Sequence, residues 1–186
     1  MVAPQEMTGR MIVRGLVGCP ICQREYSIEN GVVMFGAGEA VRAVDAVQGP
    51  DPEAVWALLG LTGPGGFVVL VGSAARLAAP LAPRLDGVHL VAVNPAPDLP
   101  PGLPVSALTH PGRIPLRDAM ARGVVLGPEA AAEPWVQEGT RVLLPGMRLV
   151  AAAERLSAPG LERLAAGNGL WVGRKSSQRS AVRKSL

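Results

Sequence analysis

Two cysteines, Cys19 and Cys22, are the residues whose type and spacing most directly suggest chemistry. A Cys-x-x-Cys pair can bind zinc, but a structural zinc ion takes four ligands, usually Cys or His. The pair supplies two of them, and residues 1–18 contain neither Cys nor His. Three interpretations follow, namely a metal-free turn, a zinc ion shared between two chains that each contribute this pair, and a redox dithiol.

The residues after the pair rank these interpretations. A redox dithiol needs its thiol at the start of a helix, where the helix dipole lowers the thiol pKa. The segment Q-R-E-Y-S-I that follows Cys22 is typical of a strand instead. We therefore rank the metal-free turn first and the redox dithiol last, and we expect no bound metal unless two chains, or the chain and a partner, share it.

No catalytic set of side chains stands out elsewhere. His89 lies within the apolar segment V-H-L-V-A-V, where a half-buried or rim position is expected. His110 lies in a Pro/Gly loop close to Arg113 and could line a cleft. Ser73 has no His or acid at the spacing of a hydrolase motif. The sequence therefore predicts no catalytic residue.

Residues 1–45 are expected to form a small β-rich unit and a connector. Asn30-Gly31 tolerates the positive φ angles of a tight hairpin, and the turn is flanked by apolar residues. The expected elements are strands at Met11–Val13, Tyr26–Ile28 and Val32–Phe35, a tight turn at Cys19–Cys22, and a weakly helical connector over 37–50.

Residues 46–174 are expected to form an α/β domain. A helix over 51–60 is well delimited, because Asp51 can cap its start, Pro52 suits its first turn and Gly60 can end it. The apolar run Phe67–Val71 is typical of a strand buried on both faces. The later elements are expected as strands at 88–93, 105–108, 124–126, 148–152 and 170–173, and helical segments at 72–85, 117–122, 129–144 and 161–166.

Strands that alternate with helices predict a mostly parallel sheet with helices on its faces. The composition agrees, since 48% of the 186 residues are hydrophobic and only 3% are aromatic. The fold class expected is therefore α/β, a Rossmann-like mostly parallel sheet with a small N-terminal β-rich unit. Because the first residues lack the apolar segment of a secretory signal, a cytoplasmic location is expected.

The last residues, 175–186, are rich in Ser and basic residues and contain no acid. This composition predicts disorder in the free chain. Such a tail either aids solubility or contacts an acidic protein or an anionic membrane surface. Nucleic acid is a less favoured partner, because the chain has one Tyr and two Phe and so few aromatic rings on which bases can stack.

Three stretches within residues 51–174 resemble a class I S-adenosylmethionine-dependent methyltransferase. They are F-V-V-L-V-G-S-A-A-R-L, R-I-P-L-R-D-A-M-A-R-G-V-V-L and W-V-Q-E-G-T-R-V-L-L-P-G-M-R-L-V. The third is the most specific, since a helix, a Pro-Gly turn and an apolar strand follow one another in that family. Only one strand is expected beyond it, so the family's final hairpin is expected to be shortened. The segment C-P-I-C-Q-R-E-Y-S-I-E-N-G-V-V-M-F is similar to the second half of the zinc knuckle found in methyltransferase-activator proteins.

The resemblance implies a cofactor site at Gly72, Ser73, Ala74 and Asn94. The family's first loop carries several glycines that let the backbone approach the cofactor. Here Gly72 is followed by Ser73, Ala74, Ala75 and the bulky Arg76. The family ends its second strand with an acid that binds the ribose hydroxyls, where this chain has the neutral Asn94. The expected site is therefore vestigial.

These observations predict a catalytically silent methyltransferase-like protein that serves as a binding or structural subunit of a larger assembly. A position on the cytoplasmic face of a membrane complex would place the basic tail near acidic headgroups. The alternative is an active S-adenosylmethionine-dependent methyltransferase that acts on RNA or a small molecule. A third hypothesis is a zinc-dependent dimer that contacts nucleic acid, with about one zinc ion for two chains.

Overall fold

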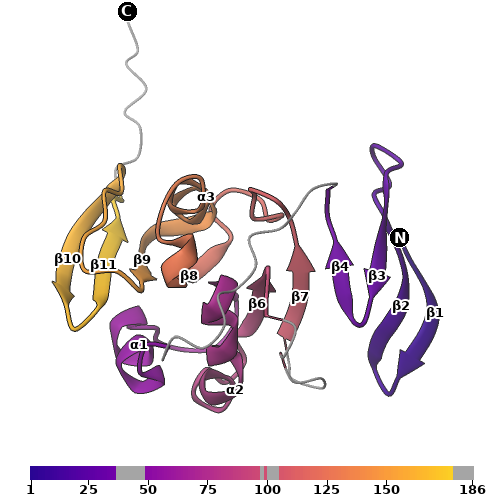
Figure 1. Cartoon of the computed structure of the whole chain (residues 1–186), viewed down its shortest axis with the longest axis horizontal. Coiled ribbons are helices and arrows are strands. Elements are labelled where there is room, and N and C mark those ends of the chain that lie inside the picture. Colours follow the sequence, from indigo (N-terminus) through magenta and orange to yellow (C-terminus); the bar gives the residue numbers. More distant parts are fainter. Residues whose placement is uncertain (37–48, 97–98, 100–104, 178–186) are drawn as a thin grey trace, which may run out of the picture.

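A computed structural model of the chain describes residues 1–36, 49–96, 99 and 105–177. These residues form one eleven-stranded mixed sheet with the strand order β1-β2-β3-β4-β7-β6-β5-β8-β9-β11-β10 (Figure 1). The strands are β1 (Val2–Thr8), β2 (Met11–Gly18), β3 (Glu25–Glu29), β4 (Val32–Met34), β5 (Phe67–Val71), β6 (His89–Val93), β7 (Val105–Thr109), β8 (Ala121–Leu126), β9 (Leu143–Ala151), β10 (Leu161–Gly167) and β11 (Leu170–Lys175).

The helices are short and few among the described residues. They are α1 (Pro52–Leu59), α2 (Ala78–Leu81) and α3 (Trp135–Val142), with 3-10 turns η1 (Gly72–Leu77), η2 (Ala82–Arg84) and η3 (Pro128–Ala130). None of these helices has the length and apolar composition needed to span a bilayer. The predicted boundaries of α1 are confirmed, because Asp51 accepts hydrogen bonds from the N–H groups of Glu53 and Ala54, and Gly60 has a φ of 58°.

The central strands are buried on both faces, as the sequence predicts for Phe67–Val71. Alternate residues of β5 point to opposite sides. Val69 and Val71 pack in one core with Trp135 of α3. Val68 and Leu70 pack in a second core with residues of α1, η1 and α2. The sheet is thus a middle layer, with α1 and α2 covering one face and α3 covering the other.

The central part of the sheet has the doubly wound order. Strands β5, β6 and β7 follow one another outward in one direction, and β8 and β9 lie on the other side of β5, all in parallel. This is the Rossmann-like arrangement, and the order reverses between β5 and β8. Ligands of such sheets bind beside the carboxyl ends of the strands at this reversal.

The N-terminal strands extend this same sheet. β1 to β4 form an antiparallel meander, and β4 then pairs in parallel with β7, with Val33 opposite Leu108. The predicted hairpin is confirmed, since Asn30 and Gly31 have φ angles of 51° and 78° between β3 and β4. Strand β1 was not predicted. The expected domain boundary at residue 45 and most of the connector over 37–50 fall outside the described residues.

Three predicted helical segments differ in the structure. Residues 161–166 form strand β10, which pairs with β11, so the final hairpin is complete rather than shortened. Residues 117–122 form no helical turn, because the N–H groups of Ala119 and Met120 donate to carbonyls at the end of α3. The chain then continues directly into β8. The helix expected over 129–144 is confined to α3 and η3, since Pro134 has no N–H to continue a helix through it.

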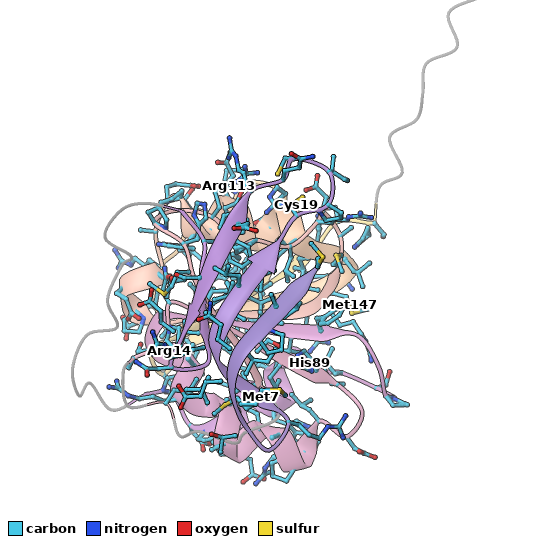
Figure 2. The ribbon with its side chains drawn as sticks, turned by 90° about the vertical axis from the view of Figure 1, so that its right-hand side faces the viewer. Met7, Arg14, Cys19, His89, Arg113 and Met147 are labelled. Carbon is cyan, nitrogen blue, oxygen red and sulfur yellow. The ribbon has the colours of Figure 1, made fainter. Side chains whose placement is uncertain are left out.

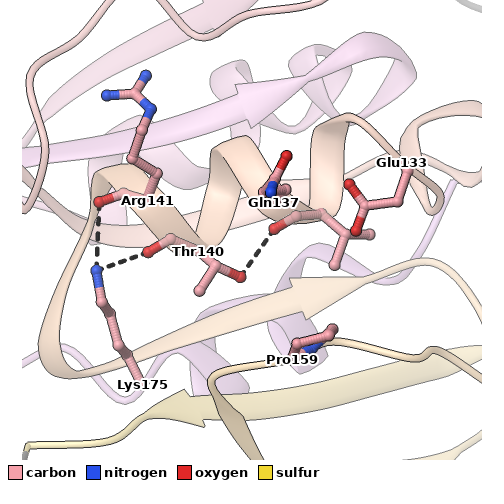
Figure 3. A pocket seen from close by; sticks show the side chains of 7 residues that line it. Glu133, Gln137, Thr140, Arg141, Pro159 and Lys175 are labelled. Atoms are coloured by element: carbon pink, nitrogen blue, oxygen red, sulfur yellow. Dashed lines mark hydrogen bonds between the residues drawn. The ribbon is translucent and has the colours of Figure 1, made fainter.

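Lys175, placed in the tail by the sequence, is the last residue of β11. Its Nζ atom donates to the carbonyl oxygens of Thr140 at 2.7 Å, Arg141 at 3.2 Å and Leu143 at 2.7 Å. Figure 3 shows the first two of these bonds beside a pocket of about 310 Å³. Burial lowers the pKa of this ammonium group. Lys175 therefore caps the carboxyl end of α3, where a cation is favoured by the helix dipole. The remaining tail residues, 178–186, lie outside the described residues.

Candidate functional site

The candidate site lies at the carboxyl ends of β5, β6 and β8. Val71 pairs with Val93, so Gly72 and Asn94 follow directly at the ends of two adjacent strands. Gly72 has a φ of 66°, and a Cβ atom there would collide with the carboxylate of Glu129. The positive φ favours glycine at this position, and a larger residue would also displace the Glu129 carboxylate.

The Glu129 side chain contacts the loop that follows β5. Its Oε1 accepts a short hydrogen bond from the backbone N–H of Ser73, and its Oε2 accepts one from the Ser73 hydroxyl at 2.9 Å. These bonds connect the loop after β5 with the loop after β8, across the point where the strand order reverses. Hydrogen bonds to a charged group contribute roughly 1.5–3 kcal/mol each when well formed. The backbone donor that a bound ligand could use at Ser73 is thus taken by the chain's own carboxylate.

The sequence predicts no functional role for Glu129. Its pattern places the residue at the start of a long helix, whereas η3 is a single 3-10 turn. A detectable signal was present, because an acid two residues after Gly127 follows the buried run of β8 and must lie at the carboxyl edge of the sheet. Its pairing with a loop 56 residues away could not be read from local sequence.

Asn94 is only 2% exposed, and both ends of its side-chain amide are hydrogen-bonded. Its Nδ2 donates to the carbonyl of His110 at 2.9 Å, and its Oδ1 accepts from the N–H of His110 at 2.9 Å. The side chain thus ties the end of β6 to the residue that follows β7. A ribose hydroxyl would have to compete with these two main-chain partners.

The four predicted cofactor residues therefore have different surroundings. Gly72 and Ser73 face Glu129 at the sheet edge, while Ala74 is buried in the core to which α1 and α2 contribute. Asn94 is paired with His110. Beside Ser73, a hollow of about 370 Å³ reaches Asp51, Pro128 and Ala152. An open space therefore remains at the carboxyl edge although the loop donor at Ser73 is occupied.

The Cys19–Cys22 turn connects β2 and β3, as predicted. The N–H of Cys19 donates to the carbonyl of Arg24, and the N–H of Gln23 donates to the carbonyl of Cys19. Hydrogen bonds from the backbone N–H groups of Cys22 and Ile21 lower the pKa of the Cys19 thiol. Within residues 1–36, 49–96, 99 and 105–177, no group of three or more Cys, His, Asp or Glu side chains is arranged to hold a metal ion. The two thiols could supply at most half of a tetrahedral zinc site.

The two histidines are held by different partners. His89 begins β6, and its Nε2 lies 2.9 Å from Oγ of Ser106 at an exposed position. His110 accepts hydrogen bonds at Nδ1 from the N–H groups of Gly112 at 3.1 Å and Arg113 at 2.8 Å. Burial lowers the pKa of His110, and the charge of Arg113 lowers it further. A neutral ring with its proton on Nε2 fits these contacts.

No family model matches the sequence, and no curated protein matches it. Among solved structures, the chain is similar to a SAM-dependent methyltransferase from Aquifex aeolicus, with 20% identity and a TM-score of 0.48 over 66% of this chain and 87% of the other. It is similar to the antibiotic-resistance methyltransferase Kmr, with 15% identity and a TM-score of 0.48 over 75% of this chain and all of the other.

A third similar structure is a complex that contains the Haloferax volcanii Trm112 methyltransferase activator. The identity is 18% and the TM-score 0.42, over 53% of this chain and 49% of the other. These neighbours are methyltransferase structures, but all three similarities are distant. The Rossmann-like arrangement is seen in the strand order and pairing of this chain itself.

Proposed function

We propose that this protein is a catalytically silent methyltransferase-like subunit that acts by binding other proteins. The observation that carries the proposal is the contact between Glu129 and Ser73 in the loop after β5. A carboxylate in that place occupies the backbone donor and adds negative charge where a cofactor would approach. The pairing of Asn94 with His110 adds a second occupied group at the neighbouring strand end.

The two edge strands of the sheet, β1 and β10, support the proposal of a protein partner. Every residue of β1 is exposed, and all residues of β10 except Leu161 are exposed. An exposed edge strand is a template for pairing with another chain. Val2 and Met7 of β1 add apolar side chains that are each 52% exposed. A location at the cytoplasmic face of a membrane complex, with the basic tail near headgroups, remains part of this proposal.

The test is calorimetric titration of the full chain with S-adenosylmethionine and with its demethylated product. We expect no binding to the wild-type protein at millimolar ligand. Glu129→Ala removes the carboxylate, whereas Glu129→Gln preserves its shape and can still accept from the Ser73 N–H. If occupation of the Ser73 N–H is the obstacle, binding appears in Glu129→Ala and stays weak in Glu129→Gln. Binding that appears in both variants would assign the obstacle to the negative charge of the carboxylate. Micromolar binding to the wild-type protein would overturn the proposal.

The partner half of the proposal is tested separately. A native pull-down with the intact chain should recover a stable complex that survives size-exclusion chromatography. A monomeric protein with no retained partner would contradict the subunit role even if S-adenosylmethionine fails to bind.

An active methyltransferase is the second candidate, and one observation favours it. The hollow of about 370 Å³ beside Ser73 lies at the carboxyl edge of the sheet, where ligands of this architecture bind. A methyl-transfer assay with radiolabelled S-adenosylmethionine on RNA and small-molecule fractions of cell extract addresses it. Transfer by the wild-type chain would establish this candidate.

A further inference from the structure

A second hollow, of about 490 Å³, lies between the N-terminal meander and the loop after β7. We call it the arginine hollow, and its lining includes Arg24, Arg113 and Arg117 together with Tyr26, Phe35 and His110. Figure 2 shows Cys19 and Arg113 at the same end of the molecule, whereas Arg14 lies toward the other end of the meander. The volume is within the range of small-molecule sites, roughly 300–1,000 Å³.

The charge at this hollow is positive. A fourth arginine, Arg141, also lines it, but its guanidinium is neutralised by Glu138 at 2.7 Å and Asp118 at 2.6 Å. Arg113 is 67% exposed and reaches Glu138 only at 4.0 Å. In the described part of the chain, neither Arg24 nor Arg117 forms an ion pair, since no carboxylate oxygen lies within 4.0 Å of either guanidinium. Among the residues that the structure describes, no acidic side chain lines the hollow itself.

His110 adds a directed donor. Its Nδ1 is occupied by the two main-chain N–H groups of Gly112 and Arg113, so the proton of the neutral ring is on Nε2. That atom has no hydrogen-bond partner among the described residues, and it lies on the side of Gly36, another lining residue. Guanidinium and imidazole N–H groups are all donors, so the polar groups on this side suit a ligand rich in acceptors.

The hollow also has an apolar wall. The rings of Tyr26 and Phe35 have centroids 4.7 Å apart and are tilted by 52°. Phe35 is fixed by its N–H bond to the carbonyl of Thr109, which continues the pairing of β4 with β7. Buried Ile114 and part-buried Leu116 also line the hollow. A ligand that uses both surfaces has a flat apolar body and a strongly anionic group.

We propose that the arginine hollow is a binding site for a nucleoside phosphate, with the phosphates held by Arg24, Arg113 and Arg117 and the base placed against Tyr26 and Phe35. Two or three guanidinium groups suit a phosphate, which carries about two charges and several acceptor oxygens, better than a single carboxylate. This site is distinct from the candidate cofactor edge, because none of Gly72, Ser73, Asn94 or Glu129 lines it.

The test is calorimetric titration of the full chain with adenosine diphosphate and, in parallel, with inorganic pyrophosphate. We expect diphosphate binding that weakens by about tenfold or more for each guanidinium removed in Arg113→Gln and Arg117→Gln, since each loses a charge-assisted hydrogen bond. Arg14→Gln is the matched control, because it removes the same charge from an exposed position on β2. Circular dichroism melting confirms that each variant is folded.

The outcomes separate the two parts of the proposal. Absence of adenosine diphosphate binding to the wild-type chain would overturn it, as would an equal loss in Arg14→Gln, which would indicate unspecific attraction to a basic protein. Pyrophosphate that binds as tightly as adenosine diphosphate would show a phosphate site without a base contact. Tighter binding of the nucleotide that is lost in Tyr26→Leu, with pyrophosphate binding unchanged, would support the aromatic wall.

Discussion

Asn94 holds the main chain of His110 at two points, by donating to its carbonyl and accepting from its N–H, each at 2.9 Å. This pairing extends the backbone connection between the ends of β6 and β7, where the N–H of Asn94 also donates to the carbonyl of Leu108 at 2.8 Å. It also gives a structural role to the residue at the end of β6, where the resemblance seen in the sequence implies an acid that binds the ribose. The position therefore offers a direct way to separate structural from cofactor roles.

Restoring an acid at this position should damage the protein. In Asn94→Asp, the amide donor is lost and a carboxylate oxygen faces the carbonyl of His110 in a site that is 2% exposed. We expect a loss of at least about 2 kcal/mol in the free energy of unfolding, measured by urea denaturation, and no gain of S-adenosylmethionine binding.

Asn168→Asp is the matched control for that substitution. Asn168 also has a φ of 52°, and it lies at an exposed turn between β10 and β11. We expect a change within about 0.5 kcal/mol there. Equal effects at the two positions would mean that the pairing with His110 contributes nothing specific.

The stability of the fold should depend on the protonation of His110. Burial and Arg113 lower the pKa of His110 below 6.5, while the charge of Glu138 opposes the shift. The unfolded chain therefore binds the proton first as pH falls, and the folded state loses stability in that range. The stability contributed by the neutral His110 ring is fully present above about pH 7 and is lost as the pH falls through the pKa of His110 in the folded protein. The melting temperature should decline accordingly.

His110→Asn isolates this effect. An Asn side chain can still accept from the N–H groups two and three residues ahead, as in an Asx turn, but it does not titrate. We expect the variant to show a smaller decrease in melting temperature than the wild-type protein between about pH 7.5 and about pH 5.5. Identical pH profiles would assign the dependence to other groups.

Chelation should leave the Cys19–Cys22 turn unchanged. The pair supplies two ligands where structural zinc takes four, and the main-chain bonds of Cys19 and Gln23 already define the turn. We expect the same melting temperature with and without a chelator. We also expect Cys22→Ser to change the free energy of unfolding by no more than about 0.5 kcal/mol. A lower melting temperature with chelator, and about one zinc ion for two chains, would instead establish a shared site.

Local sequence was sufficient where neighbouring residues decide the structure. The caps at Asp51 and Gly60 delimit α1, the Asn30-Gly31 turn sets a hairpin, and the apolar run Phe67–Val71 is a buried strand. In each case the physical cause, such as a capping side chain, a positive φ or burial on both faces, acts within a few residues. The Rossmann-like alternation could be predicted for the same reason.

Tertiary structure decided what depends on distant partners. The segment Leu161–Gly167 contains good helix formers but is a strand, because β11 offers an open edge and pairing with it outweighs a weak local preference. Glu129 reaches Ser73 and Asn94 reaches His110 only after the strand ends are brought together. The sequence alone determined which residues lie near the sheet edge. Only the folded sheet determined which of them are already occupied by one another, because hydrogen bonds between separate loops leave no periodic signal in the chain.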